Sequence, residues 1–153
     1  MPPSLPRRGL SAANAQLAAA DKLRREGRAA EAVAALQIAA RLEPNNAMVF
    51  HELGCACLDA GRPMQAIEAL RRAIAILPTF AQAWWRLGAA LERMFDEPSA
   101  LQAYLKATEL LPSLAEPQFR LGVLFEDRGR PHDAAARYVR AAQSASNPAL
   151  RRL

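Results

Sequence analysis

The sequence predicts an all-α fold made of four helical hairpins that repeat every 34 residues. The first observation is periodic: prolines and Leu-Gly pairs recur at this spacing, as Pro44, Pro78 and Pro112 and as Leu53-Gly54, Leu87-Gly88 and Leu121-Gly122. The second is compositional, because 52% of the residues are hydrophobic, many of them alanine, and β-branched residues are sparse. The third is that no stretch alternates apolar and polar residues as a strand does. Since alanine enters a helix most easily and permits close packing, the repeating unit is helical.

Within one repeat, the residue types fit two antiparallel helices joined by a tight turn. In the second repeat, Phe50, Leu53 and Cys57 fall on one helical face. Gly61 follows, where a helix ends easily in a left-handed conformation, and Pro63 then opens the next helix. The same pattern predicts helices over residues 13–26, 29–43, 47–60, 63–77, 81–94, 97–111, 115–128 and 131–145.

Two repeats depart from the pattern. The third has Phe95 in the turn column that holds glycine in the others. Because a Phe at positive φ is strained, we expect this turn to differ in shape. The second helix of the fourth repeat offers small residues where earlier repeats offer Ile and Leu, so we expect the stack to end near residue 146. The predicted organisation is a disordered lead containing Pro and Arg (1–12), four repeats (13–46, 47–80, 81–114 and 115–146) and a short tail (147–153).

These columns resemble the tetratricopeptide repeat (TPR) family. The family pattern of Trp, Leu-Gly, Tyr, Ala, Phe, Ala and Pro is met best by the third repeat, with Trp84, Leu87, Gly88, Ala100, Tyr104, Ala107 and Pro112. The resemblance covers about residues 13–146 and implies a right-handed superhelical α-solenoid. It also implies that the first helix of each repeat lines a concave side, and that the chain holds a partner polypeptide.

The residues expected in this groove are those of the first helices that internal packing does not use. Trp84 occupies the packing column, so Trp85 must point elsewhere, and Phe119 repeats the position of Trp85 one unit on. Exposed apolar patches usually mark binding sites. The predicted partner-binding groove consists of Met48, His51, Cys55, Gln82, Trp85, Arg86, Phe119, Arg120 and Val123. The alternative is that both rings pack against neighbouring helices.

One binding mode of the family can be compared position by position. Members that bind the acidic C-termini of heat-shock chaperones use a clamp of Lys, Asn, Asn, Lys and Arg, and at the matching places this chain has Leu17, Asp21, Glu52, Gln82 and Arg86. Only Arg86 matches, and two acidic residues would repel a carboxylate, so we do not expect this mode. Arg86 and Arg120 recur one repeat apart; they either pair with an acidic group of a partner or are simply solvated.

Catalysis, a cofactor and a metal site are not expected. The chain has two histidines and lacks both a Gly-rich phosphate loop and an HExxH motif. His51 and Cys55 share a helical face, but two ligands fall short of a structural zinc site. The net charge of +5 favours acidic partners, yet the arginines do not interleave with aromatic residues as a platform for single-stranded nucleic acid requires, so nucleic acid is disfavoured.

The same composition bounds the setting of the protein. No stretch approaches the roughly 20 apolar residues needed to cross a membrane. Two cysteines in a chain of 153 residues favour a reducing compartment, and the preference for arginine over lysine is typical of GC-rich bacterial genomes. We therefore expect a cytoplasmic, bacterial protein that is a monomer or a weak dimer.

The leading functional prediction is an adaptor or scaffold that holds a protein or peptide segment in a largely apolar concave groove. One alternative is a cytoplasmic chaperone similar to the small TPR chaperones of bacterial secretion systems. Another is an accessory repeat domain of a longer transferase, which a reading frame continuing past Leu153 would favour.

Overall fold

The computed structural model describes residues 8–147, and in this range it contains eight α-helices and no strand. The helices are α1 (Arg8–Arg25), α2 (Ala29–Leu42), α3 (Ala47–Asp59), α4 (Pro63–Ile76), α5 (Ala81–Arg93), α6 (Glu97–Leu110), α7 (Ala115–Asp127) and α8 (Pro131–Ser146). The all-α prediction is confirmed, and from α2 to α8 the predicted bounds agree with the observed ones to within one residue. None of these helices combines the length and apolar character needed to cross a membrane.

The ends of the described range correct one expectation. Helix α1 begins at Arg8, so the disordered lead expected over residues 1–12 is wrong for residues 8–12. Residues 1–7 lie outside the described range, and so does the expected tail except for Asn147, which caps α8. Helix α8 ends at Ser146, where the repeat stack was expected to end.

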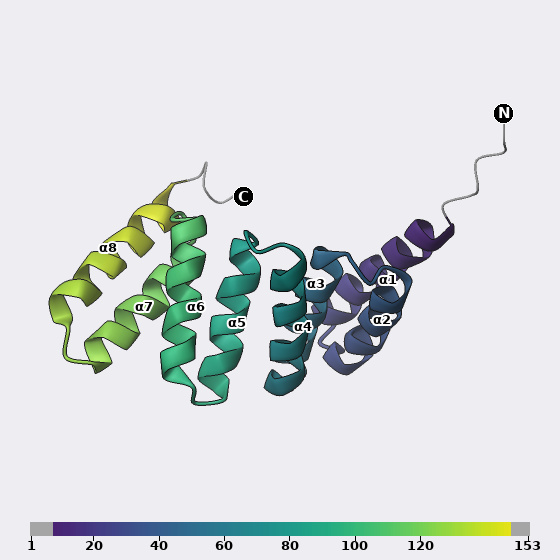
Figure 1. Cartoon of the computed structure of the whole chain (residues 1–153), viewed down its shortest axis with the longest axis horizontal. Coiled ribbons are helices and arrows are strands. Elements are labelled where there is room, and N and C mark those ends of the chain that lie inside the picture. Colours follow the sequence, from purple (N-terminus) through teal and green to yellow (C-terminus); the bar gives the residue numbers. More distant parts are fainter. Residues whose placement is uncertain (1–7, 148–153) are drawn as a thin grey trace. The chain divides into compact units, whose positions relative to one another are not determined.

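The chain divides into two compact units, Met1–Pro78 and Thr79–Leu153. Unit 1 contains helices α1 to α4, and unit 2 contains helices α5 to α8. Within each unit, consecutive helices pair as antiparallel hairpins: α1 with α2, α3 with α4, α5 with α6, and α7 with α8 (Figure 1). The hairpins of a unit join through α2 and α3 in unit 1 and through α6 and α7 in unit 2.

Glycines allow the two helices of a hairpin to approach closely. A Cβ atom added at Gly54 would lie 2.5 Å from Cγ of Leu70, and one added at Gly88 would lie 2.7 Å from Cε1 of Tyr104. Both distances are too short for real carbon atoms. The Leu-Gly column of the sequence therefore marks the contact between the first and second helix of each hairpin.

The turn at Phe95 has the same shape as the glycine turns. Phe95 adopts a φ of +60°, close to the values of +76° at Gly27 and +70° at Gly61. The amide of Asp96 donates to the carbonyl of Leu91 at 3.0 Å, as the amide of Arg62 donates to Cys57 at 2.8 Å. The expectation of a differently shaped turn is therefore wrong: the hydrogen bonds that end the helix impose the left-handed conformation, and the Phe95 side chain, 92% exposed, accepts it.

Candidate functional site

A pocket of about 350 Å³ in unit 2 gathers an aromatic ring and three arginines. Its lining residues come from α5, α6 and α7, and we call it the Trp–Arg pocket: Trp85, Arg86, Ala89, Glu92, Arg93, Tyr104, Glu116 and Arg120. Trp85, Ala89 and Glu92 stand three or four residues apart on α5, so they share one face of that helix. Residues of α7 close the pocket from the next hairpin of the same unit.

One arginine of the pocket is neutralised by a buried carboxylate. The Nη2 and Nε atoms of Arg120 donate to Oε2 of Glu92 at 2.7 and 3.1 Å, and the hydroxyl of Tyr104 donates to the same oxygen at 3.1 Å. Burial and the neighbouring Glu92 raise the pKa of Tyr104, which keeps its hydroxyl protonated as the donor. Burial alone would lower the pKa of Arg120, but its bond to Glu92 outweighs this and raises it. This pair is a fixed wall of the pocket.

Arg86 differs from Arg120 because it has no carboxylate partner within residues 8–147. Its guanidinium carbon lies 4.1 Å from the centroid of the Trp85 ring, a distance typical of cation–π stacking. Its Nε atom is buried and makes no hydrogen bond within the described part of the chain. A buried donor without a partner is unfavourable, so this arginine is ready to receive an acceptor from outside.

A second, more apolar pocket lies on the last hairpin. It has a volume of about 650 Å³ and is lined by residues of α7 and α8, and we call it the end pocket: Ala115, Glu116, Phe119, Tyr138, Ala141, Ala142 and Ala145. The rings of Phe119 and Tyr138 lie 5.5 Å apart between centroids, in a tilted arrangement. Phe119 is nevertheless 48% exposed, so it does not belong to the core.

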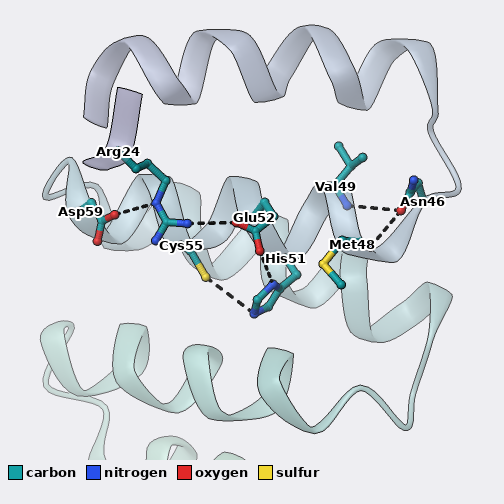
Figure 2. A network of polar contacts seen from close by, with 8 residues as sticks. All are labelled: Arg24, Asn46, Met48, Val49, His51, Glu52, Cys55 and Asp59. Atoms are coloured by element: carbon teal, nitrogen blue, oxygen red, sulfur yellow. Dashed lines mark hydrogen bonds and ion pairs between the residues drawn. The ribbon is translucent and has the colours of Figure 1, made fainter. Parts of the chain in front are cut away.

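In unit 1, a polar network links α1 to α3 (Figure 2). Arg24 donates from Nη1 to Glu52 at 2.9 Å and from Nε to Asp59 at 2.8 Å. The two ring nitrogens of His51 lie 3.2 Å from Oε1 of Glu52 and 3.6 Å from Sγ of Cys55. Burial lowers the pKa of His51, but the bonds to Cys55 and Glu52 outweigh it and raise this pKa to about 9. His51 is therefore a cation at neutral pH.

The network does not form a metal site. Among the residues that the structure describes, no three His, Cys, Asp or Glu side chains lie close enough together to hold an ion. Both cysteines are free and buried, and Cys57 lines a separate pocket with Phe50 and Leu53. The arrangement of charges instead ties the first hairpin of unit 1 to the second.

The structure brings together three of the predicted groove residues, Trp85, Arg86 and Arg120, in the Trp–Arg pocket. Phe119 lies in the end pocket. Gln82 and Val123 are partly exposed in unit 2, and in unit 1 Met48 is exposed and His51 partly exposed. Cys55 is a correction: it is only 3% exposed and bonded to His51, so it is not a surface available to a partner.

Sequence reasoning missed two residues of the Trp–Arg pocket, Glu92 and Tyr104. A signal for Glu92 exists in the spacing of charges. Arg24 pairs with Glu52, and Glu92 pairs with Arg120, each across 28 residues. Opposite charges that recur at this separation mark neighbouring first helices of a helical repeat, with the sign reversed between the two pairs.

Hairpins of equal length, closed by left-handed turns and packed through a glycine column, define a helical-repeat protein. Residues 51–115 match the tetratricopeptide repeat family model. The chain is thus a tetratricopeptide repeat protein, and its eight described helices fit four repeats, as the sequence predicted.

Solved structures show the same fold. The crystal structure of MamA is 24% identical, with a TM-score of 0.80 over 90% of this chain and 80% of that chain. The first TPR region of Spaghetti (RPAP3), bound to the HSP90 peptide SRMEEVD, is 19% identical, with a TM-score of 0.74 over 78% of this chain and 94% of that one. YrrB, a TPR protein with an unusual peptide-binding site, is 25% identical, with a TM-score of 0.69 over 92% and 72%. No curated protein sequence matches the chain. The prediction of a TPR-like α-solenoid fold is confirmed.

Proposed function

We propose that this protein is an interaction module that holds a partner polypeptide, with the Trp–Arg pocket anchoring an acidic side chain beside an apolar one. The observation that carries the proposal is Arg86, a cation stacked on Trp85 whose Nε atom has no hydrogen-bond partner in the described chain. The fold supports a peptide as the ligand, because RPAP3 binds an HSP90 peptide and YrrB has a peptide-binding site.

The chemistry of the pocket favours a carboxylate as the anchoring group. Hydrogen bonds between a guanidinium and a carboxylate are shorter and roughly twice as strong as neutral ones. A carboxylate on Arg86 would also satisfy its buried Nε donor. Arg120 does not compete for the ligand, because Glu92 already neutralises it.

The apolar part of the ligand is expected to rest on Trp85. A large aromatic ring with few rotatable bonds is a good anchor at an interface, since little side-chain entropy is lost on binding. We retain Met48, His51, Gln82 and Val123 as proposed flanking contacts, since each is at least partly exposed. The ligand that fits is therefore an extended segment with Asp or Glu next to a large apolar residue.

We further infer that the module acts as an adaptor in the cytoplasm of a bacterium. The two free cysteines fit a reducing compartment, and the strong preference for arginine fits a bacterial genome rich in G and C.

A random peptide library displayed on beads would test the proposed ligand. The purified chain should enrich peptides with an acidic residue beside a large apolar one. Arg86→Gln should lose the acidic preference and weaken binding of the selected peptides about tenfold or more, as expected when one partner of a charge-assisted bond is removed. Trp85→Ala should lose the apolar preference.

Arg140→Gln is the matched control. Arg140 is an exposed arginine of the same unit, on α8, and it does not line the Trp–Arg pocket, so its removal changes the net charge equally without touching the site. Circular dichroism should show the same helical content in all variants. Equal peptide preferences for Arg86→Gln and Arg140→Gln would contradict the proposal.

A further inference from the structure

The end pocket is a face that another helix covers in each preceding hairpin of the same unit. In unit 1, α3 packs on α2, and Leu36 of α2 is buried there; in unit 2, α7 packs on α6 and buries Tyr104 and Thr108. One repeat later, Tyr138 is partly exposed and Ala142 is exposed. The end pocket therefore has the lining of a helix-binding face and lacks the helix within the described residues.

The opposite surface lies on α1. On α7, Pro117, Gln118 and Leu121 form the face that packs toward the preceding hairpin, and all three are buried. Three periods of 34 residues earlier, α1 has Ala15, Gln16 and Ala19 at these places. Ala15 and Ala19 are exposed and Gln16 is partly exposed, so the face of α1 that should pack on a preceding hairpin is open.

Gln16 repeats a residue that is used inside the chain. Gln118 is fully buried, and its Nε2 atom donates to the carbonyl of Pro112 at 3.2 Å, just beyond the end of α6. The matching positions of α3 and α5 hold Phe50 and Trp84, so only α1 and α7 have Gln in this column. A helix placed on the end pocket as α7 is placed on α6 would set Gln16 opposite the carbonyl of Ser146, one period after Pro112.

The charges at these two faces are also complementary. In unit 1, Arg24 of α1 pairs with Asp59 of α3 at 2.8 Å. At the end of the array, the residue that corresponds to Arg24 is Glu126, and the residue of an incoming α1 that corresponds to Asp59 is Arg25. Arg25 is 79% exposed and bonded only to Asp21 of its own helix among the printed ion pairs, and Glu126 is exposed and accepts from Tyr138 at 2.8 Å. The ion pair is thus recreated with reversed sign.

We propose that α1 of a second copy of this chain docks in the end pocket, in the place that a fifth repeat would take. The contact is heterologous, because two different surfaces meet, so each copy keeps one α1 face and one end pocket for further neighbours. The small side chains of both faces, mostly alanine, bury little apolar area, so the association is weak. The proposal does not depend on the peptide ligand, since Ala19 and Ala142 lie outside the Trp–Arg pocket.

Two blocked variants of the full chain test the proposal. Ala19→Glu places a charge on the α1 face, and Ala142→Glu places one in the end pocket. Sedimentation velocity of the wild type should show an average mass that rises with protein concentration. Each variant alone should remain monomeric, because one half of every contact is blocked. Their equimolar mixture should form a dimer, since the intact α1 of one variant meets the intact end pocket of the other.

Charge reversal tests the register of the contact. Arg25→Glu and Glu126→Arg should each weaken self-association severalfold, and the double variant should recover it, because the pair is restored with its signs exchanged. Ala136→Glu is the control: Ala136 is exposed on α8, on the side of the helix away from the end pocket, and its substitution should leave association unchanged.

The outcomes that overturn the proposal are distinct. A wild-type chain that stays monomeric at every concentration would mean that the end pocket is open or serves another protein. Self-association that persists in Ala142→Glu would place the contact elsewhere. A mixture of the two blocked variants that remains monomeric would exclude a contact between these two faces. Peptide selection by Ala142→Glu, measured separately, should match the wild type.

Discussion

At the scale of single residues, Phe95 is the clearest conflict between local preference and the fold. Its φ of +60° lies in a region that costs a residue with a Cβ about 1–2 kcal/mol. The ring is almost fully exposed, so no packing compensates for this cost. The turn keeps its shape because the amide of Asp96 must bond to Leu91 where α5 ends.

Phe95→Gly should therefore stabilise the protein. Glycine removes the strain, while its extra freedom in the unfolded chain offsets about 0.5–1 kcal/mol of that gain. We expect the free energy of unfolding in urea to rise by about 1 kcal/mol or less. The reverse change, Gly61→Ala, should lower it by about 1 kcal/mol at the equivalent turn. A Phe95→Gly variant that is less stable than the wild type would show that the ring makes contacts that stabilise the turn.

At the scale of helices, the sequence predicted the fold well because its signals are local. Gly61 and Pro63 mark where one helix ends and the next begins, and the residues between such marks follow a helical period. The shape of the turn at Phe95 could not be predicted from the residue, because hydrogen bonds of the neighbouring helix ends determine it.

The candidate site was predicted in part for the same reason. Column logic found Trp85, Arg86 and Arg120, which share faces of first helices. It could not find that Glu92 neutralises Arg120 but leaves Arg86 free, because that depends on distances between two helices. It also placed Cys55 on the surface, because a position on a helical face does not give the depth of burial.

The glycine column allows a prediction about packing between paired helices. Gly88 faces Tyr104, which is buried and held by Glu92, whereas Gly122 faces Tyr138, which is partly exposed. Alanine in a helix gains about 1 kcal/mol over glycine. In Gly88→Ala the Tyr104 ring cannot move, so overpacking should outweigh this gain and lower the free energy of unfolding by about 1–2 kcal/mol.

Gly122→Ala is the matched variant, because its added Cβ would approach Tyr138 even more closely, at 2.5 Å from Cε1. The Tyr138 ring can swing toward solvent, so we expect a change near zero in the same urea measurement. Equal losses in the two variants would show that the closeness of the contact, and not the freedom of the ring to move, determines the cost.

At the scale of the whole molecule, the division into two compact units predicts how damage spreads. In a repeat array each hairpin contacts only its neighbours, so a local loss of stability is felt most within its own unit. Hydrogen exchange followed by mass spectrometry measures this directly, because amides exchange through local as well as global opening.

Gly88→Ala should therefore speed amide exchange in α5 to α8 more than in α1 to α4. Gly54→Ala should do the opposite, because its added Cβ would meet the fully buried Leu70 of unit 1 at 2.5 Å. The two variants act as controls for each other, since both add one methyl group to the same column of the repeat. If both variants raised exchange equally throughout the chain, the molecule would open as one cooperative body, and the two units would not be separate units of stability.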